Sequence, residues 1–229
     1  MGKDTHEITL FGDKSASLPA HLQNDQGMGN ENAGDALAVP QIKLLQALSP
    51  EMRNVDGAQV GMLYNNVTGA LYDSMYVANV FLDHYFTVWK DRKKGGGKFG
   101  EYTTEQEANE HIKTLEGSPQ DYLAQETHKH SLILLDESGE VTGPAVIYMK
   151  QSQLTPSRAW NTEIVQTKAA RFATIWTLGS KIESNKRNDE YANYSVTQAG
   201  WAPEGLYEEL KIIYSSISGK RPIAEAEAA

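Results

Sequence analysis

The chain of 229 residues is long enough for one sizeable domain or two small ones. It has no cysteine, which excludes disulfides, thiolate zinc sites, iron–sulfur clusters and cysteine nucleophiles. Its net charge of −9 argues against non-specific binding to duplex DNA through bulk charge, and the lack of any run of about 18 apolar residues argues against a transmembrane helix.

The first 38 residues predict a disordered arm. They are rich in Gly, Asn, Asp, Ser and Gln and show no sustained hydrophobic periodicity. We expect ordered structure to begin near Val39-Pro40. Residues 41–48 fit either a strand or a short helix, because the run is too short for its pattern to decide.

Residues 59–90 predict mostly β-structure. A short strand is expected at 59–64, and residues 65–69 contain the Asn and Gly of a turn. Residues 75–90 are dense in Val, Phe, Tyr and Trp, and this strand is long enough to bend or to break into two. Three glycines at 95–97 then predict a mobile loop.

Residues 103–115 predict a helix, with Thr103 or Thr104 as its N-cap and Glu107 completing a capping box. A hairpin is expected next, with strands at 128–135 and 145–150 around a turn at 137–139. A helix should follow from Thr155-Pro156 to about Lys168. The last elements expected are strands at 171–182 and 190–197 and a helix over 201–218 that ends at Gly219.

This inventory of about six short strands and two or three helices fits a small barrel or an α+β domain, and we expect a mainly β protein with added helices. Strands and helices do not alternate regularly, which argues against a doubly wound parallel sheet. We expect a single domain over residues 39–219, between the disordered arm at 1–38 and a short flexible tail at 220–229.

The strongest functional signal lies at residues 84–102, where aromatic rings and cations surround a glycine-rich loop. Residues 90–98 carry five positive charges and one acid. Single-strand binders need this pairing, since bases stack on rings while Lys or Arg neutralises phosphates. On a strand Tyr85, Thr87 and Trp89 share one face and their even-numbered neighbours the other, so one set can be core and the other a stacking platform. The alternative is an ordinary core strand that runs into a solvated basic loop.

A second cluster favours a different chemistry. Glu126, His128 and His130 alternate, so on a strand they would share a face, and two imidazoles with one carboxylate can supply three metal ligands. A metal-dependent enzyme centred on these residues is therefore one alternative function, and a polar strand end exposed to water is the simpler interpretation. A protein–protein adaptor that uses the C-terminal helix is a further alternative. No phosphate-binding loop, dinucleotide-binding motif or nucleophile elbow is present.

The order of several segments is more informative than any single motif. These segments are PQIKLLQALSPE at 40–51, G-x-x-Y-N at 61–65, FTVWKDRKKGGG at 86–97, ETHKHSLILLD at 126–136 and PAVIYMKQSQLTPSRAWN at 144–161. Over about residues 39–202 the chain resembles a family of phage-encoded proteins described as single-stranded DNA-binding proteins. The resemblance implies an oligonucleotide/oligosaccharide-binding (OB) fold, a five-stranded barrel, with additions. It also implies a role in phage DNA replication or recombination in the cytoplasm of the infected bacterial cell, with other phage replication or recombination proteins as further partners.

We therefore expect a non-enzymatic, sequence-independent binder of single-stranded DNA that needs no cofactor or metal and does not bind membranes. Phosphate contacts are expected from Lys90, Arg92, Lys93, Lys94 and Lys98. Stacking is expected from Tyr85, Trp89, Phe99 and Tyr102. The opposite wall is expected to contain Lys150, Arg158 and Arg171.

Overall fold

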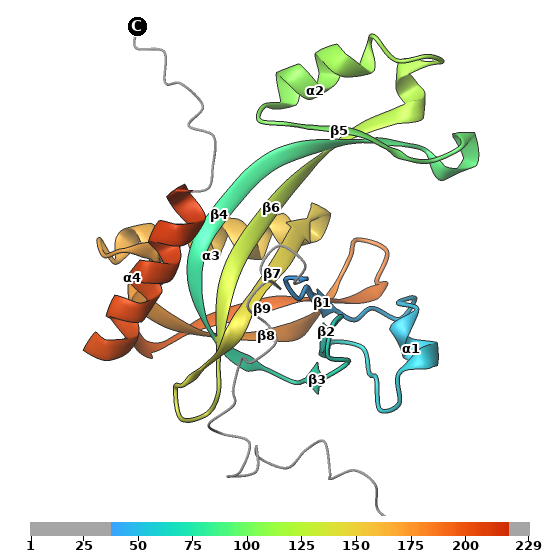
Figure 1. Ribbon diagram of the computed structural model, residues 1–229. Helices are drawn as coiled ribbons and strands as arrows, with labels where there is room; N and C mark the ends of the chain where they lie inside the picture. The colour runs from blue at the N-terminus through green and yellow to red at the C-terminus, as the bar shows by residue number, and fades with distance from the viewer. Residues whose placement is uncertain (1–37, 220–229) are drawn as a thin grey trace, which may run out of the picture. The chain divides into compact units, whose positions relative to one another are not determined.

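The computed structural model describes residues 38–219 of the chain, and those from Val39 onward belong to one structural unit. The predicted arm, apart from residue 38, and the predicted tail lie outside the described residues. Two antiparallel sheets and four α-helices make up the described part (Figure 1). The prediction of a mainly β protein with added helices is confirmed.

The larger sheet is arranged around one long, shared strand. Its six antiparallel strands are, in spatial order, β7 (Val141–Lys150), β6 (Tyr122–Leu135), β4 (Met75–Lys90), β8 (Thr174–Ser184) and β9 (Glu190–Trp201), with β5 (Lys98–Tyr102) also beside β4. β6 pairs with β4 along its length, whereas β8 pairs with the start of β4 and β5 with its end. A register shift between Asn79 and Phe81 accompanies the bend of β4 that Figure 1 shows.

The smaller sheet connects the two edges of the larger one. It contains β1 (Ile42–Leu44), β2 (Leu63–Asn65) and β3 (Leu71–Tyr72), and the short helix α1 (Glu51–Asn54) follows β1. Gln41 forms a parallel bridge with Val146 of β7. The Gln46 side chain donates a hydrogen bond to the Ala192 carbonyl of β9 and accepts one from the Ala192 N–H. Among the described residues no strand ladder joins β7 to β9, so the sheet is not closed into the expected barrel.

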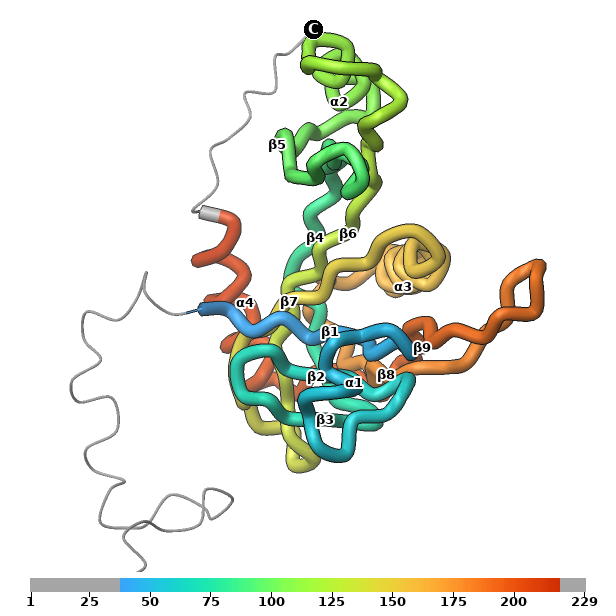
Figure 2. The backbone as a smooth tube through the Cα atoms, turned by 90° about the vertical axis from the view of Figure 1, so that its right-hand side faces the viewer, coloured from blue at the N-terminus to red at the C-terminus, as the bar shows by residue number. Residues whose placement is uncertain are grey.

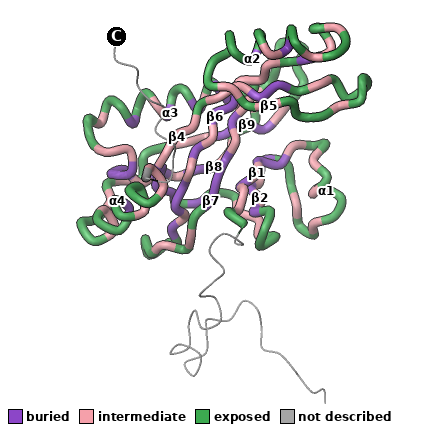
Figure 3. Tube along the Cα trace, turned by 45° about the horizontal axis from the view of Figure 1, so that its top comes forward, coloured by how far each residue is buried: buried purple, intermediate pink, exposed green. Residues whose placement is uncertain are grey.

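The two long helices cover different sides of the sheet. α3 (Leu154–Gln166) follows β7 and contributes Trp160 and Ile164 to the largest buried cluster. α4 (Glu204–Gly219) contributes Leu210 to a second cluster, formed with residues of β4 and β6 and with Phe172. Figure 3 shows that buried residues follow the strands, while exposed residues dominate the outer turns of the helices.

A small subdomain extends from the far ends of β4 and β6. Figures 1 and 2 both show β5 and α2 (Glu105–Ile112) there, away from α3, α4 and the smaller sheet. Its core consists of Val88, Ala108, Ile112 and Tyr122. Thr104 is the N-cap of α2 and forms the predicted capping box with Glu107.

Several predicted elements have different ends in the structure. Residues 42–44 of the undecided run form a strand, and β6 begins at Tyr122, six residues before the predicted start. The helix predicted from Thr155 begins at Leu154, and its N-cap is Gln153 without a side-chain bond. Trp201, predicted as helical, is the last residue of β9. β5 is not predicted at all.

Candidate functional site

The pairing register brings side chains of three strands onto one face of the sheet. Tyr85 of β4 pairs with Thr127 of β6, which in turn pairs with Lys150 of β7. Paired residues point to the same side and side chains alternate along each strand, so Tyr85, Lys150 and Trp89 share a face. Val88, on the opposite face, is fully buried, whereas Trp89 is 36% exposed. The two faces of β4 are not divided as simply as predicted, because Thr87 on the Trp89 face is 2% exposed and His84 on the Val88 face is exposed.

Two adjoining hollows on this face share Trp89 and Lys150 in their walls. The larger, of about 680 Å³, lies between the loop after β4 and the first residues of β6; its other lining residues are Lys90, Asp91, Arg92, Lys93, Gly97, Gln120, Asp121, Tyr122, Leu123 and Gln125. The smaller, of about 500 Å³, is further lined by Gln41, Tyr85, Thr87, Lys98, Glu101 and Tyr148. We refer to the two hollows together as the Trp89 groove.

Cations and aromatic rings contact each other within this groove. The Lys150 Nζ atom lies 5.6 Å from the centre of the Trp89 ring and 5.9 Å from that of Tyr148. Lys90 Nζ lies 5.3 Å from the centre of the Tyr122 ring. Ring faces attract cations at these distances. Partial burial lowers the pKa of Lys150 and raises the pKa of Tyr85, so the Tyr85 hydroxyl stays protonated and can donate a hydrogen bond.

Four cations of the groove form no ion pair with an acidic residue of the described part of the chain. Lys90, Arg92, Lys93 and Lys150 take part in none of the ion pairs formed among residues 38–219. By contrast, Lys98 Nζ lies 2.7 Å from a carboxylate oxygen of Glu101. Unpaired cations in a chain of net charge −9 provide a local positive site that is free to bind an anion.

The loop that carries Arg92 and Lys93 is a hydrogen-bonded turn that follows Lys90, the last residue of β4. Asp91 donates its N–H to the Asp121 carbonyl, accepts the Gly96 N–H at its own carbonyl, and accepts the Lys93 N–H at its side chain. Gly95, Gly96 and Gly97 all have positive φ, between 65° and 114°, which glycine adopts without the strain that a side chain would cause. The glycines therefore allow the reverse turn that holds the cations beside Trp89.

The other predicted site residues are not among those that line the groove. Phe99 packs edge-on against the Tyr122 ring, and Lys94 lies 3.9 Å from Asp121. Tyr102 lies against the ring of His111. Arg158 donates a hydrogen bond from Nη2 to Oε2 of Glu126 over 2.6 Å. Arg171 is half-buried, donates a hydrogen bond to Asn161 and lines a separate hollow beside α4.

Arg158 and Arg171 are consequently not in the opposite wall of the Trp89 groove, and Lys150 is the one residue of that predicted wall that lines it. Sequence reasoning misses Tyr148, Gln125 and Gln41, which also line the groove. They come from segments distant in the sequence, and only the strand pairing brings them beside Trp89.

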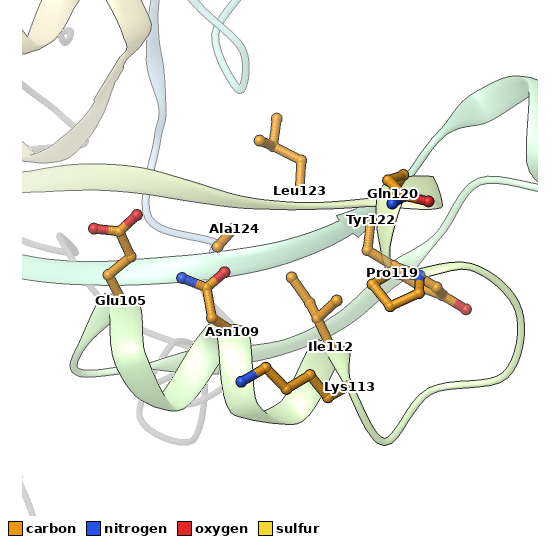
Figure 4. Close-up of a pocket in the computed structure, with 9 residues that line it drawn as sticks. All are labelled: Glu105, Asn109, Ile112, Lys113, Pro119, Gln120, Tyr122, Leu123 and Ala124. Carbon is orange, nitrogen blue, oxygen red and sulfur yellow. The ribbon is translucent and has the colours of Figure 1, made fainter.

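A third hollow lies on the other side of the first residues of β6. It has a volume of about 400 Å³ and separates β6 from α2. Figure 4 shows Asn109 and Ile112 pointing from α2 towards the strand, while Leu123 points away from the helix. Glu105 and Lys113 give this hollow one charge of each sign, so it lacks the excess of cations that lines the Trp89 groove.

The histidines lie on the opposite face of the sheet from Trp89. His130 is fully buried; its Nδ1 lies 2.9 Å from Asn79 Nδ2 and its Nε2 lies 2.8 Å from Ser157 Oγ. Both ring nitrogens are therefore occupied, and His130 cannot serve as the predicted third ligand. Burial lowers the pKa of His130 to about 3, so the ring is neutral. The structure groups Glu126 and His128 with His84 instead.

Glu126 is the centre of this group. Its Oε1 atom lies 3.2 Å from Nε2 of His84 and 3.2 Å from Nε2 of His128, and Arg158 donates to both carboxylate oxygens. Burial alone would raise the pKa of Glu126, but the hydrogen bonds and charges of Arg158 and His128 outweigh it and lower that pKa. Burial also lowers the pKa of His128. His84 is missed by sequence reasoning because it lies on β4, opposite His128 in the register.

Comparison with known proteins identifies one family. The model of a family described as Pam3 phage gp34-like protein matches residues 12–222. Neither the curated proteins nor the solved structures yield a match. Within residues 38–219 no helix is both long enough and apolar enough to cross a membrane.

Proposed function

Since the chain belongs to the Pam3 phage gp34-like family, a family of phage proteins, we propose that it binds single-stranded DNA without regard to base sequence. The observation that carries this proposal is the Trp89 groove, in which an exposed ring lies beside cations that pair with none of the acidic residues the structure describes. The proposal needs neither catalysis nor a cofactor. It includes a role in phage replication or recombination in the cytoplasm of the infected host, together with other phage proteins of those processes.

The chemistry of the groove suits a single strand better than a duplex. A base can stack on Trp89 only if its own face is free, and in a duplex both faces are covered by neighbouring bases. Stacking does not read the hydrogen-bonding edge of a base, so it is tolerant of sequence. Lys90, Arg92 and Lys93 lie along the larger hollow, where they can neutralise successive phosphates.

The position of the groove in the fold supports the same proposal. The path β7-β6-β4-β8-β9 contains five strands, with α3 connecting β7 to β8. In chain order β6 and β7 are the second and third of these five. An OB fold is a five-stranded, partly open barrel that binds oligonucleotides on the face of strands 2 and 3 and with the loop between strands 1 and 2. The Trp89 groove lies on β6 and β7 and on the connection from β4 to β6, which are the equivalent places.

Fluorescence anisotropy with a labelled oligonucleotide tests the proposal. The full chain is titrated into single-stranded and duplex forms of one sequence of about 30 bases, a length that exceeds the ~4–16 nucleotides bound per OB fold. We expect tight binding to the single strand that weakens as salt rises, and much weaker binding to the duplex. A second, unrelated sequence should bind equally well. Absence of single-strand binding at low salt would overturn the proposal.

A further inference from the structure

We propose that His84, Glu126 and His128 form a binding site for one divalent transition-metal ion, with Zn²⁺ as the preferred ion. Two imidazole nitrogens and one carboxylate oxygen are a ligand set that suits Zn²⁺ and its neighbours in the transition series, and does not suit Mg²⁺ or Ca²⁺. The site lies on the opposite face of the sheet from the Trp89 groove and is independent of DNA binding.

The ligand atoms are already close together. The three lie within 4.8 Å of one another, and Glu126 Oε1 is 3.2 Å from each imidazole Nε2. In a tetrahedral zinc site with bonds of about 2.0–2.1 Å, neighbouring ligand atoms are about 3.3 Å apart. An ion can therefore be accommodated with small side-chain movements.

A buried hydroxyl orients one of the ligands. His128 Nδ1 lies 2.6 Å from Oγ of Ser157, a fully buried residue at the start of α3. Histidines that bind metals are usually fixed by a hydrogen bond at the other ring nitrogen. When an ion binds, the hydroxyl accepts the Nδ1 proton of His128 and donates its own proton to Nε2 of His130. For this the Asn79 amide turns, so that its buried oxygen, which has no hydrogen-bond partner among the described residues, replaces Nδ2 and accepts the Nδ1 proton of His130. In that arrangement His128 directs the lone pair of Nε2 towards Glu126.

The site is open to solvent on one side and faces one competing cation. The His84 side chain is 45% exposed, so an ion can enter and keep a water molecule as its fourth ligand. Arg158 donates to both Glu126 oxygens, and its charge repels an incoming cation. Its side chain is 58% exposed and can turn into solvent when an ion binds. We therefore expect Arg158 to weaken metal binding without preventing it.

A bound ion would connect two strands and a helix. His84 lies on β4, Glu126 and His128 lie on β6, and Ser157 links His128 to α3. The site is thus placed to stabilise this part of the sheet, and an ion that binds only the folded chain raises its stability by mass action.

The test uses the untagged full chain, stripped of metal with a chelator and then titrated with Zn²⁺ in competition with a chromophoric chelator. We expect one ion per chain and a rise in melting temperature on binding. Bound Co²⁺ should give the visible absorption of a tetrahedral site. His84→Ala should weaken Zn²⁺ binding at least 10-fold, and Arg158→Gln should strengthen it. His111→Ala, which removes an imidazole on α2, is the matched control and should change nothing.

Three results would overturn the proposal. The first is the absence of stoichiometric Zn²⁺ binding in the intact chain. The second is binding that survives both His84→Ala and Glu126→Gln. The third is binding that is lost in a His6→Ala/His21→Ala variant, because it would assign the ion to the N-terminal segment. His84 is exposed and its replacement leaves the core intact, so failure to fold does not obscure the outcome.

Discussion

Trp89 is the residue that tests the groove most directly. If bases stack on its ring, Trp89→Ala should cost about 1–3 kcal/mol of single-strand affinity, or roughly 5- to 150-fold. The salt dependence should hardly change, because no charge is removed. Anisotropy titrations at several salt concentrations measure both quantities. Trp201→Ala is the control: Trp201 is 58% exposed at the end of β9 and does not line the groove.

Arg92 tests the phosphate contacts separately from stacking. Arg92 is exposed in the turn after β4 and has no acidic partner among the described residues. Arg92→Glu should weaken binding to every sequence alike, and the slope of log affinity against log salt should become shallower by about 0.7 per lost contact. Arg53→Glu in α1 makes the same charge change on another exposed arginine. Equal effects of the two substitutions would mean that only net charge matters and that the loop is not a contact site.

The sequence was informative about residues within one strand and uninformative about residues across strands. Alternation along β4 was enough to place Trp89 and Val88 on opposite faces, because it depends on local geometry alone. Tyr148 and His84 could not be assigned in this way. Each joins its site through the pairing of β4, β6 and β7, and a shift of one residue in that register would have moved it to the other face.

At the scale of elements, the cap of α2 gives a prediction about local stability. Thr104 accepts the Glu107 N–H, and Glu107 accepts the Thr104 N–H in return. Thr104→Ala should therefore destabilise α2 by about 1 kcal/mol, while Thr104→Ser should retain most of the cap. Hydrogen exchange of the amides in residues 105–112 measures the local effect. Equal exchange in the two variants would show that the hydroxyl contributes nothing.

Elements with a strong local signal were predictable, and those that depend on a neighbour were not. The capping box of α2 and the dense β-forming run of β4 are both encoded locally. β5 has the sequence KFGEY, which contains two charges and a glycine, and it is a strand because β4 provides a partner. β9 similarly continues to Trp201, where it pairs with Thr174 of β8, so α4 begins after Pro203 and not before it.

At the scale of the whole molecule, the distribution of charge matters more than its sum. The chain carries −9, yet the Trp89 groove contains four cations that form no ion pair within residues 38–219. The surrounding acidity lowers the attraction of DNA to the remaining surface, while the groove keeps a local positive site. Such a chain should hold a strand in one place and release it readily as salt rises, which fits reversible coverage of single strands better than permanent coating.

The buried histidines predict that the folded unit is acid-sensitive. Burial lowers the pKa of His130 to about 3 in the folded chain, whereas an unfolded histidine titrates near 6.5. As pH falls below about 6.5 the unfolded chain takes up a proton that the folded chain does not. Stability is therefore highest above about 6.5, and it falls by up to about 1.4 kcal/mol per pH unit below that value. The lowered pKa of His128 acts in the same direction.

Urea unfolding at pH 7.5, 6.5 and 5.5 measures this effect, with a chelator present so that no metal ion contributes. The free energy of unfolding should be nearly constant between the first two values and lower by about 1 kcal/mol at the third. Carboxylates with lowered pKa values, such as Glu126 and Glu51, also stabilise the folded chain less in acid. Their contribution to the free energy of unfolding is lost only below about pH 4.5, so it does not affect the comparison of the three pH values. His130→Gln should remove most of the slope between pH 6.5 and 5.5. A wild-type stability that does not change over this interval would contradict the burial of a neutral imidazole.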